Sequence, residues 1–280
     1  NLVSMADNIM VGQLGTNQMS GVAIINQLFF VFNLLVFGGM SGAGLFSAQY
    51  FGQKNHNGVR DVFRMKILIG ITIIAISLSV MIFLHEPLIN MFLHEGSSSG
   101  NIQETFNYAK NYLYIMVIGI APFVISNCYN TTLKESGQTV VPMKAGVLAV
   151  VFDIVLNYIF IFGKLGFPTM GVVGAAIATV ISRFVECGYL VIYTHIHSND
   201  YPFIKHCYRT LKVPGSLVKK IIITGAPLML NEFLWAGGLT LQTQALSTKG
   251  LATVGGLNIC NTIGNISNCI FVTMGTTIAI

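Results

Sequence analysis

The sequence predicts an all-α protein whose helices cross a membrane several times. Hydrophobic residues make up 53% of its 280 residues, charged residues only 9%, and the mean hydropathy is +0.70. Soluble domains carry about 25% charged residues, so this composition is typical of a membrane protein. Apolar runs of the roughly 20 residues that a helix needs to cross a bilayer recur along the chain. Such runs are too long for barrel strands, and only helices or closed barrels satisfy their backbone hydrogen bonds in lipid.

The apolar runs predict six complete spans and two partial ones. The complete spans lie near 20–50, 62–84, 107–131, 141–162, 171–194 and 221–247, and the partial ones cover 1–12 and the stretch from 251 onward. The chain begins inside a predicted helix at Asn1 and stops within an apolar run at Ile280. We therefore expect a fragment, truncated at both ends, of a longer polytopic protein.

Basic residues gather in alternate loops, which predicts the orientation of the chain. Eleven cations lie on one side of the predicted membrane and three on the other. The eleven are Lys54, Arg60, Arg64, Lys66, Lys134, Lys144, Lys205, Arg209, Lys212, Lys219 and Lys220, and the three are Lys110, Lys164 and Lys249. The positive-inside rule places the eleven in the cytoplasm. The net charge of +5 therefore reflects topology, and we expect no nucleic acid as a partner.

A polar, basic stretch at residues 196–220 divides the chain into two parts. We interpret it as a cytoplasmic linker between a first membrane lobe of six helices (1–195) and the start of a second lobe (221–280, about two helices). An internal repeat supports this division. At an offset of 235 residues, Gly15, Gly21, Ile24, Asn26 and Asn33 fall on Gly250, Gly256, Ile259, Asn261 and Asn268. Parallel repeats of this kind occur in transporters, with the binding site between or within the halves.

Asp153 is a carboxylate inside the apolar run 141–162. A charged side chain at the centre of a membrane helix costs roughly 2.5–3.5 kcal/mol on insertion scales, so such residues face a protein interior or a water-filled cavity. Asn157 follows one helical turn later and shares the same helical face. Acids within membrane spans usually mark ion or substrate sites, so this face is the first candidate for a functional site.

Four motifs carry a resemblance to a known transporter family. The motif DIVLNYIFIFG (153–163), followed by GVVGAAIATV (171–180), is similar to helices 5 and 6 of the multidrug and toxic compound extrusion (MATE) transporters. DNIMVGQLG (7–15) resembles the end of that family's first helix, and LKESGQTVVP (133–142) resembles its loop between helices 4 and 5. The resemblance implies a fold of two six-helix lobes, of which this chain would hold the first and the opening of the second.

The same resemblance implies a function. It predicts a secondary active antiporter that exports organic cations or other amphipathic xenobiotics in exchange for Na⁺ or H⁺. Its partners would be small drug-like molecules and the lipid bilayer of the cell membrane, and it would work as a monomer. No cofactor other than the coupling ion, and no enzymatic activity, is implied.

The resemblance also assigns a coupling-cation site to Asp7, Asp153, Asn157 and Thr179. Two carboxylates, an amide and a hydroxyl suit a hard cation such as Na⁺, and a buried carboxylate can also carry a proton. In part of the family the helix-5 pair reads Asn then Asp, whereas here it reads Asp153 then Asn157, so the identity of the ion does not carry over. The alternative interpretation is a neutral hydrogen-bonded cluster that only fixes helix packing.

Three further polar residues are candidates for a substrate cavity. Glu232, within the run 221–247, has no opposite charge within a helical turn, so we interpret it as an acid that faces cationic substrate. Its alternative interpretation is an interfacial glutamate. Asn26 and Asn33 place amides on one face of the second span, where they either bridge helices or line the cavity.

Arg183 and Glu186 are three residues apart in the span 171–194, which predicts a self-neutralising ion pair, with gating as the alternative. Arg183 also bears on a second transport function, a flippase for lipid-linked sugars. Such a protein should line its cavity with several cations to hold a pyrophosphate. With the other cations assigned to the loops, the membrane region offers only Arg183, already next to Glu186.

Other function classes find less support. There is no P-loop, so no ATP is implied, and the glycine clusters lack the strand that precedes a nucleotide-binding loop. The five cysteines show no CxxC spacing, which predicts neither a disulfide framework nor a metal site. A membrane sensor or scaffold without transport activity is the alternative from another class.

Overall fold

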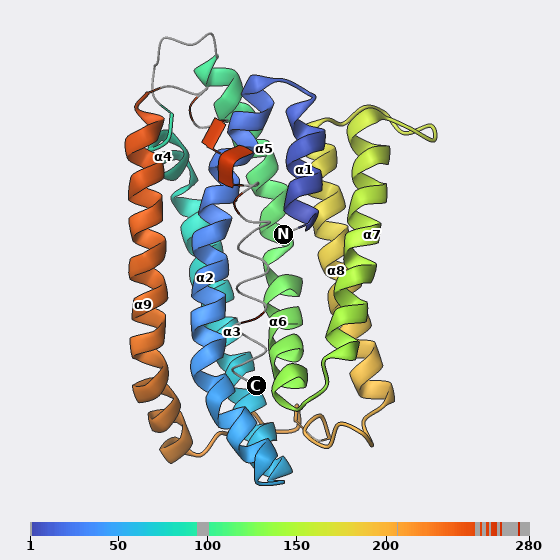
Figure 1. The fold of residues 1–280 in the computed structure, drawn as a ribbon, viewed down its shortest axis with the longest axis vertical. Coiled ribbons are helices and arrows are strands. Elements are labelled where there is room, and N and C mark those ends of the chain that lie inside the picture. The colour runs from blue at the N-terminus through green and yellow to red at the C-terminus, as the bar shows by residue number, and fades with distance from the viewer. Residues whose placement is uncertain are drawn as a thin grey trace.

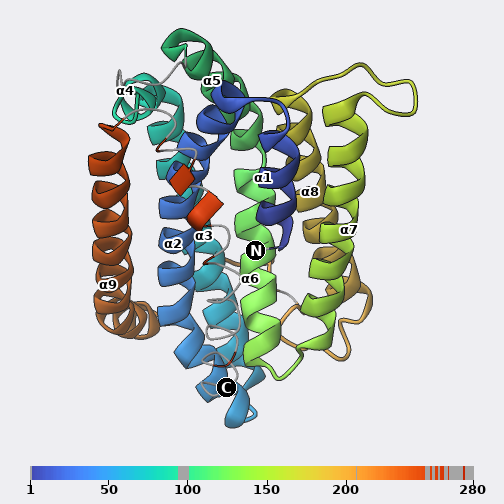
Figure 2. The ribbon, with the colours of Figure 1, turned by 45° about the horizontal axis from the view of Figure 1, so that its top comes forward.

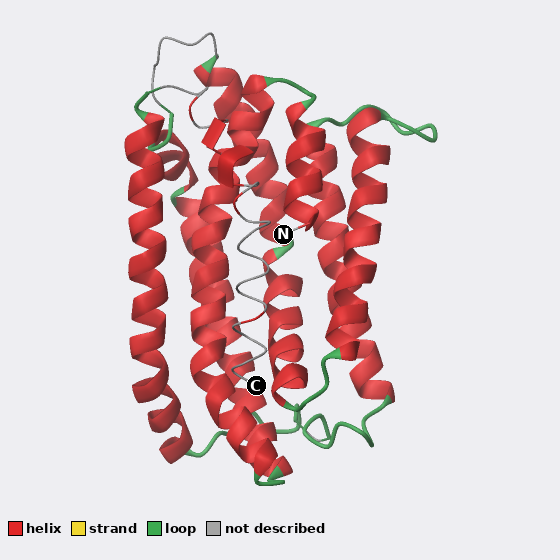
Figure 3. Cartoon of the chain, viewed as in Figure 1, coloured by secondary structure: helices red, strands yellow, loops and turns green. Residues whose placement is uncertain are grey.

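A computed structural model shows that the chain folds into a bundle of long helices that lie roughly side by side (Figure 1). The structure describes residues 2–93, 101–205 and 207–249, together with 253, 256–257, 259–261, 264 and 274. Within these ranges every regular element is a helix and none is a strand (Figure 3). The predicted all-α class is confirmed.

The helices follow the predicted spans. They are α1 (Leu2–Gly12), α2 (Thr16–Gly52), α3 (His56–Phe83), α4 (His85–Asn90), α5 (Ile102–Ile118), α6 (Ile120–Glu135), α7 (Val140–Phe162), α8 (Val172–Ile196) and α9 (Gly215–Ser247). In the described part of the chain, α2, α3, α7 and α8 are each long and apolar enough to cross a membrane, and the bent pair α5–α6 adds a fifth span if counted as one. Helix α9, which covers the predicted span 221–247, is not among the helices that are long and apolar enough by this measure. The partial span predicted from 251 lies outside the continuous described ranges.

The connections between helices fall at the two ends of the bundle. The α2–α3 turn, the α6–α7 connection and segment 197–214 lie together at the lower end in Figure 1, and the α1–α2 and α7–α8 connections lie at the upper end. The lower end holds most of the loop cations that the positive-inside rule assigns to the cytoplasm. We call it the basic end.

The span predicted at 107–131 is broken in two at Gly119. Helices α5 and α6 meet there at an angle of 47°. Pro122, in the first turn of α6, has no N–H to donate to a carbonyl one turn earlier, which interrupts the hydrogen-bond ladder. Glycine also leaves room for α8, because a Cβ at Gly119 would lie 3.2 Å from Arg183 Cδ. The break therefore places Arg183 against bent backbone in the middle of the bundle.

The prediction that Arg60, Arg64 and Lys66 lie in a cytoplasmic loop is wrong, because α3 begins at His56 and includes all three. Other cations of the predicted loops also lie within helices near the basic end, namely Lys134, Lys144, Lys219 and Lys220.

The Lys66 side chain is fully buried, and its Nζ lies 2.5 Å from Glu135 Oε2 on α6. The hydroxyls of Thr131 and Thr132 lie 3.0 and 3.2 Å from the same nitrogen. These three acceptors match the three hydrogens of the ammonium group, as a buried lysine requires. The ion pair joins α3 to α6.

Segment 197–214, within the predicted linker, packs against the bundle. Four of its side chains are buried, namely Tyr201, Phe203, Ile204 and Cys207. The ring of Phe203 lies 5.6 Å from that of Phe63 on α3. Arg64 Nε donates to the Cys207 carbonyl oxygen at 2.9 Å. The segment thus forms part of the basic end of the bundle.

Helix α9 runs antiparallel along α2, as Figures 1 and 2 show. Rising residue numbers on α2 meet falling numbers on α9, from Gln27 with Thr240, through Phe30 with Trp235, to Gly42 with Gly225. At the last pair the backbones touch: a Cβ on Gly225 would lie 3.4 Å from Gly42 Cα, and one on Gly42 would collide with Gly225 Cα. Small residues allow this close approach, which supplies packing energy in lipid.

We predict that Gly42→Ala destabilises the contact between α2 and α9, by roughly 1–3 kcal/mol, because the added methyl group overpacks two touching backbones. Gly146→Ala on α7 is the matched control, since a Cβ there meets no atom within 4 Å. Unfolding of the purified protein in detergent would measure both. Equal effects of the two substitutions would contradict the close crossing.

Candidate functional site

One amide joins two carboxylates that lie far apart in the sequence. Asn157 Nδ2 donates to Asp7 Oδ1 on α1 at 2.5 Å and to Asp153 Oδ2 on its own helix α7 at 3.0 Å. Asp153 and Asn157 are fully buried, and the Asp7 side chain is buried as well. An amide nitrogen carries two hydrogens, so each carboxylate receives one. The structure thus brings together Asp7, Asp153 and Asn157, three of the four predicted site residues.

Close packing of α8 on α7 adds two hydroxyl groups. A Cβ at Gly174 would lie 2.8 Å from the Phe160 backbone, so only glycine lets the helices approach this closely. Ser182 Oγ lies 3.1 Å from Asp153 Oδ1 and 2.8 Å from the Thr179 carbonyl oxygen. The Thr179 hydroxyl lies beside Asp153 and also bonds to a carbonyl of its own helix. The cluster therefore contains the predicted Thr179 and, in addition, Ser182.

Arg183 and Glu186 form no ion pair within 4.0 Å among the described residues, although the two charges act on each other as the predicted pair requires. The guanidinium of Arg183 instead lies 5.4 Å from the ring centre of Phe29 and 5.0 Å from that of Phe123. Its Nη1 donates to the Gly119 carbonyl oxygen at 3.5 Å. Spacing along one helix permits the ion pair, but the α5–α6 break offers Arg183 two aromatic faces and a carbonyl.

The positive charge of Arg183 acts on both carboxylates of the cluster. If Asp7 and Asp153 are ionised, these three groups together carry excess negative charge, and Glu186, whose charge also acts on Arg183, adds to it. Uncompensated charge inside an apolar bundle is costly. Binding of a monovalent cation would lower the excess, so the cluster has the electrostatics of a cation site.

The cluster also holds an unused acceptor. Asn157 Oδ1 is buried and has no hydrogen-bond partner among the described atoms. Buried acceptors without a partner are rare in folded proteins, and an unplaced ion or water is a common reason for one. Carboxylate, amide and hydroxyl oxygens are the ligands that hard cations prefer. The donor set around Asn157 is therefore chemically suited to Na⁺, and its carboxylates to a proton.

Glu232 lies at the contact between α9 and α2, on elements other than those of the cation cluster. Its Cβ and Cγ would each lie 3.5 Å from a Cβ at Gly38 on α2. The side chain is half-buried, and within the described ranges it has neither an ion pair nor a hydrogen bond. Glu232 is thus an unpaired acid between the first eight helices and α9.

The two predicted amides of α2 follow the same contact. Asn33 lies between Phe30 and Gly38, so the antiparallel register places it between the levels of Trp235 and Glu232 on α9. Its Oδ1 is buried without a partner in the described part of the chain. Asn26 is half-buried and lies about two turns before Asn33 on α2. The amides, the acid and the Phe30–Trp235 ring pair thus lie along one helix contact.

Sequence reasoning missed Ser182 and the position of Arg183. Ser182 had a usable signal, because it follows Thr179 by three residues and so shares its helical face. Arg183 had none, because its contacts depend on the bend at Gly119 and on Phe29 of another helix.

Comparisons with known proteins identify the family and the fold. Residues 1–159 match the family model described as MatE. A relative from Thermotoga maritima, described as a probable multidrug resistance protein NorM, is 31% identical over 258 residues. The match covers 92% of this chain and 53% of that relative. The chain therefore spans about half the length of the relative.

Solved structures share the fold. A structure described as MATE in the bent conformation has 27% identity and a TM-score of 0.67, covering 82% of this chain and 48% of that one. A structure of the MATE multidrug transporter DinF-BH, solved as a complex, has 22% identity and a TM-score of 0.75. That match covers 94% of this chain and 56% of the other.

We predict that Asn157→Ala destabilises the protein by roughly 1–3 kcal/mol, because two buried carboxylates each lose a donor. The cost should fall in an Asp7→Asn background, where the new amide can donate to Asp153. A double-mutant cycle of unfolding in detergent measures this coupling. Asn127→Ala is the control, since the Asn127 amide donates to a carbonyl of its own helix. The same cost in both backgrounds would contradict the bridge.

Proposed function

The chain belongs to the MatE family, and on this premise we propose that it works in a secondary antiporter that exports organic cations and other amphipathic compounds. A monovalent cation, Na⁺ or H⁺, would drive the export. The observation that carries the proposal is the buried pair of carboxylates, Asp7 and Asp153, held by Asn157. Acids at this depth in a membrane bundle are the usual markers of ion coupling.

The excess negative charge of the cluster supports coupling to a monovalent cation at this site. With Arg183 nearby, two ionised carboxylates still carry excess negative charge, to which Glu186 adds. A Na⁺ ion would take oxygen ligands from Asp7, Asp153, Asn157 and Thr179. A proton would instead bind to one of the two carboxylates. Both ions would lower the same excess, so the order of Asp153 and Asn157 leaves the choice between them to experiment.

The contact between α2 and α9 supports a site for the exported compound. Glu232 offers an unpaired negative charge there, and Asn26, Asn33 and the Phe30–Trp235 pair add amides and aromatic faces. Aromatic faces and an acid together suit a flat organic cation. The names of the similar proteins point the same way, because they describe multidrug resistance proteins and a multidrug transporter.

Export would follow from reciprocal coupling of the two sites. If the cation and the compound favour states that open to opposite sides of the membrane, the binding of one disfavours the binding of the other. The proposal requires no ATP and no catalytic step. It places the protein in the cell membrane as a monomer, with residues 196–220 on the cytoplasmic side.

We predict that Asp153→Asn abolishes coupled efflux while the protein remains folded and inserted, because the cluster loses the charge that binds the cation. Drug accumulation in a pump-deficient host that expresses the full-length protein measures this effect, with Na⁺ and pH gradients imposed separately. Asn127→Ala serves as the control for expression and folding. Unchanged efflux at equal expression would contradict the assignment of Asp153 to the cation site.

We predict that Glu232→Gln weakens the efflux of cationic compounds more than that of neutral ones. A charge in a low-dielectric site discriminates by the charge of the ligand more than by its shape. Paired transport assays with a cationic and a neutral compound measure the ratio of the two losses. An equal loss for both classes would make Glu232 a structural residue.

A further inference from the structure

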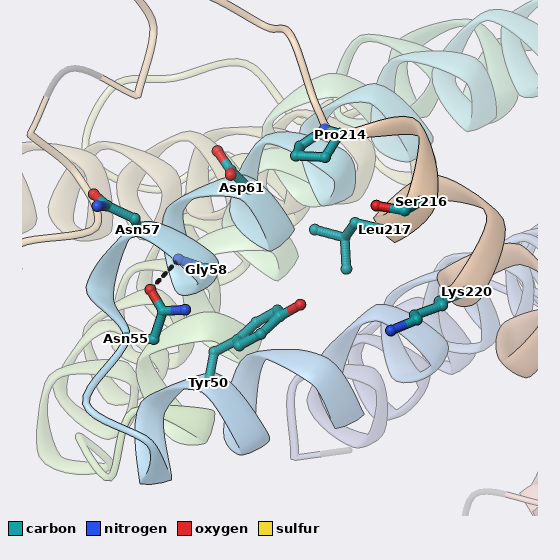
Figure 4. A pocket seen from close by; sticks show the side chains of 9 residues that line it. All are labelled: Tyr50, Asn55, Asn57, Gly58, Asp61, Pro214, Ser216, Leu217 and Lys220. Carbon is teal, nitrogen blue, oxygen red and sulfur yellow. Dashed lines mark hydrogen bonds between the residues drawn. The ribbon is translucent and has the colours of Figure 1, made fainter.

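A small cavity lies at the basic end, between the α2–α3 turn and the first turns of α9 (Figure 4). Its volume is about 250 Å³. The lining comes from both sides of the contact: Tyr50, Asn55, Asn57, Gly58 and Asp61 on one wall, and Pro214, Ser216, Leu217 and Lys220 on the other. None of these residues belongs to the cation cluster or to the α2–α9 contact around Glu232.

The carbonyl oxygens of the two asparagines in this cavity each already accept a hydrogen bond from the wall. Asn55 Oδ1 accepts from the Gly58 backbone N–H at 3.0 Å, which also caps α3. Asn57 Oδ1 accepts from Arg60 Nη2 at 2.8 Å. Each oxygen keeps a second lone pair, but the NH₂ group is the part of each asparagine that can donate to a ligand.

The carboxylate of Asp61 is also accounted for. Asp61 Oδ1 forms an ion pair with Arg64 Nη1 at 3.0 Å, one helical turn along α3. This pairing balances its charge within the wall. In Figure 4 the carboxylate points away from Tyr50 and Lys220. The acid therefore does not offset the positive charge of Lys220 on the opposite wall.

The groups that remain available can all donate hydrogen bonds. The Tyr50 hydroxyl and the Lys220 amine point toward each other across the cavity in Figure 4. Tyr50 is held in this position because its ring lies over Gly58, where a Cβ would be 2.6 Å from Tyr50 Cγ. Within the described ranges, neither the Tyr50 hydroxyl nor the Lys220 amine has a hydrogen bond or an ion pair. The Tyr50 hydroxyl, the Lys220 amine and the Ser216 hydroxyl face the cavity. Lys220 supplies the positive charge that no acid of the lining pairs with.

We propose that this cavity binds a phosphate group, and that the phosphate belongs to the headgroup of an anionic phospholipid. Several donors and one ammonium group converging on one space are the chemistry that recognises a phosphate. The predicted orientation places the basic end in the cytoplasmic leaflet, which carries the anionic lipids. Large apolar side chains are exposed on α9 one turn from the cavity, at Ile222 and Ile223, where acyl chains would lie.

A ligand in this cavity would contact both walls at once. Tyr50 belongs to α2 and Lys220 to α9, so the bound headgroup bridges the first helices of the chain and α9. A ligand stabilises the conformation in which its contacts are complete. The bound lipid therefore favours the arrangement in which α9 packs against the α2–α3 turn at the basic end.

The test uses the purified full-length protein and compares two substitutions that remove the same charge. Lys220→Gln removes the ammonium group of the cavity. Lys219→Gln removes its exposed neighbour, which does not line the cavity. Retention of phosphatidylglycerol, phosphatidylcholine and inorganic phosphate is measured by native mass spectrometry and by the ligand-dependent shift in unfolding temperature. Unfolding without added ligand checks that each variant is folded.

We expect Lys220→Gln to weaken phosphatidylglycerol binding by roughly tenfold or more, because it loses a charge-assisted hydrogen bond, and Lys219→Gln by no more than the roughly fivefold effect of one surface charge near anionic lipid. Tyr50→Phe, which keeps the ring and removes one donor, should weaken it to an intermediate degree. Equal losses in the two lysine variants would overturn the site, because they would reflect general attraction to anionic lipid. If inorganic phosphate but not phosphatidylglycerol raises the unfolding temperature, and only Lys220→Gln removes this effect, the cavity binds phosphate but the phosphate does not come from a lipid headgroup.

Discussion

The amide of Asn157 between Asp7 and Asp153 is the interaction on which the arrangement of α1, α7 and α8 depends. Carboxylates inside an apolar bundle need donors and a compensating charge. Asn157 donates to both acids, and Ser182 donates to Asp153. These groups come from three helices, so the polar groups are satisfied only when the helices pack in this arrangement.

Arg183 connects this cluster to the rest of the bundle. Its charge acts on the carboxylates, while its guanidinium lies against Phe29 of α2, Phe123 of α6 and the carbonyl of Gly119. Helix α2 in turn packs along α9 over most of its length. A change in the charge of the cluster can therefore alter the forces on the α5–α6 break and on α2. This contiguous set of contacts is a physical route by which the proposed cation site and the α2–α9 contact could influence each other.

Most helices, and the pairing of Asp153 with Asn157, could be predicted from particular residues, whereas Asp7 and Thr179 were assigned to the cluster by the family resemblance. Runs of apolar side chains located α2, α3, α7 and α8, because a helix that crosses a bilayer must be predominantly apolar over about 20 residues. Asp153 and Asn157 share a face by spacing alone. Lys66 was misplaced because its partners, Glu135 and two threonines, come from α6, and a sequence pattern along α3 contains no trace of them. Gly119 and Pro122 offered a local signal for the break that hydropathy alone does not register.

The sequence by itself determined the all-α membrane class, the helix positions and the faces that carry acids, because composition and periodicity act along a single helix. Only the tertiary structure decided that Asp7 meets Asn157, that Arg183 contacts the Gly119 carbonyl at the α5–α6 break, and that Tyr50 faces Lys220 across a cavity. Each of these outcomes depends on how closely two helices approach, which small residues such as Gly42 and Gly174 control. Charges in an apolar bundle then find the partners that this packing brings within reach, whatever their separation along the chain.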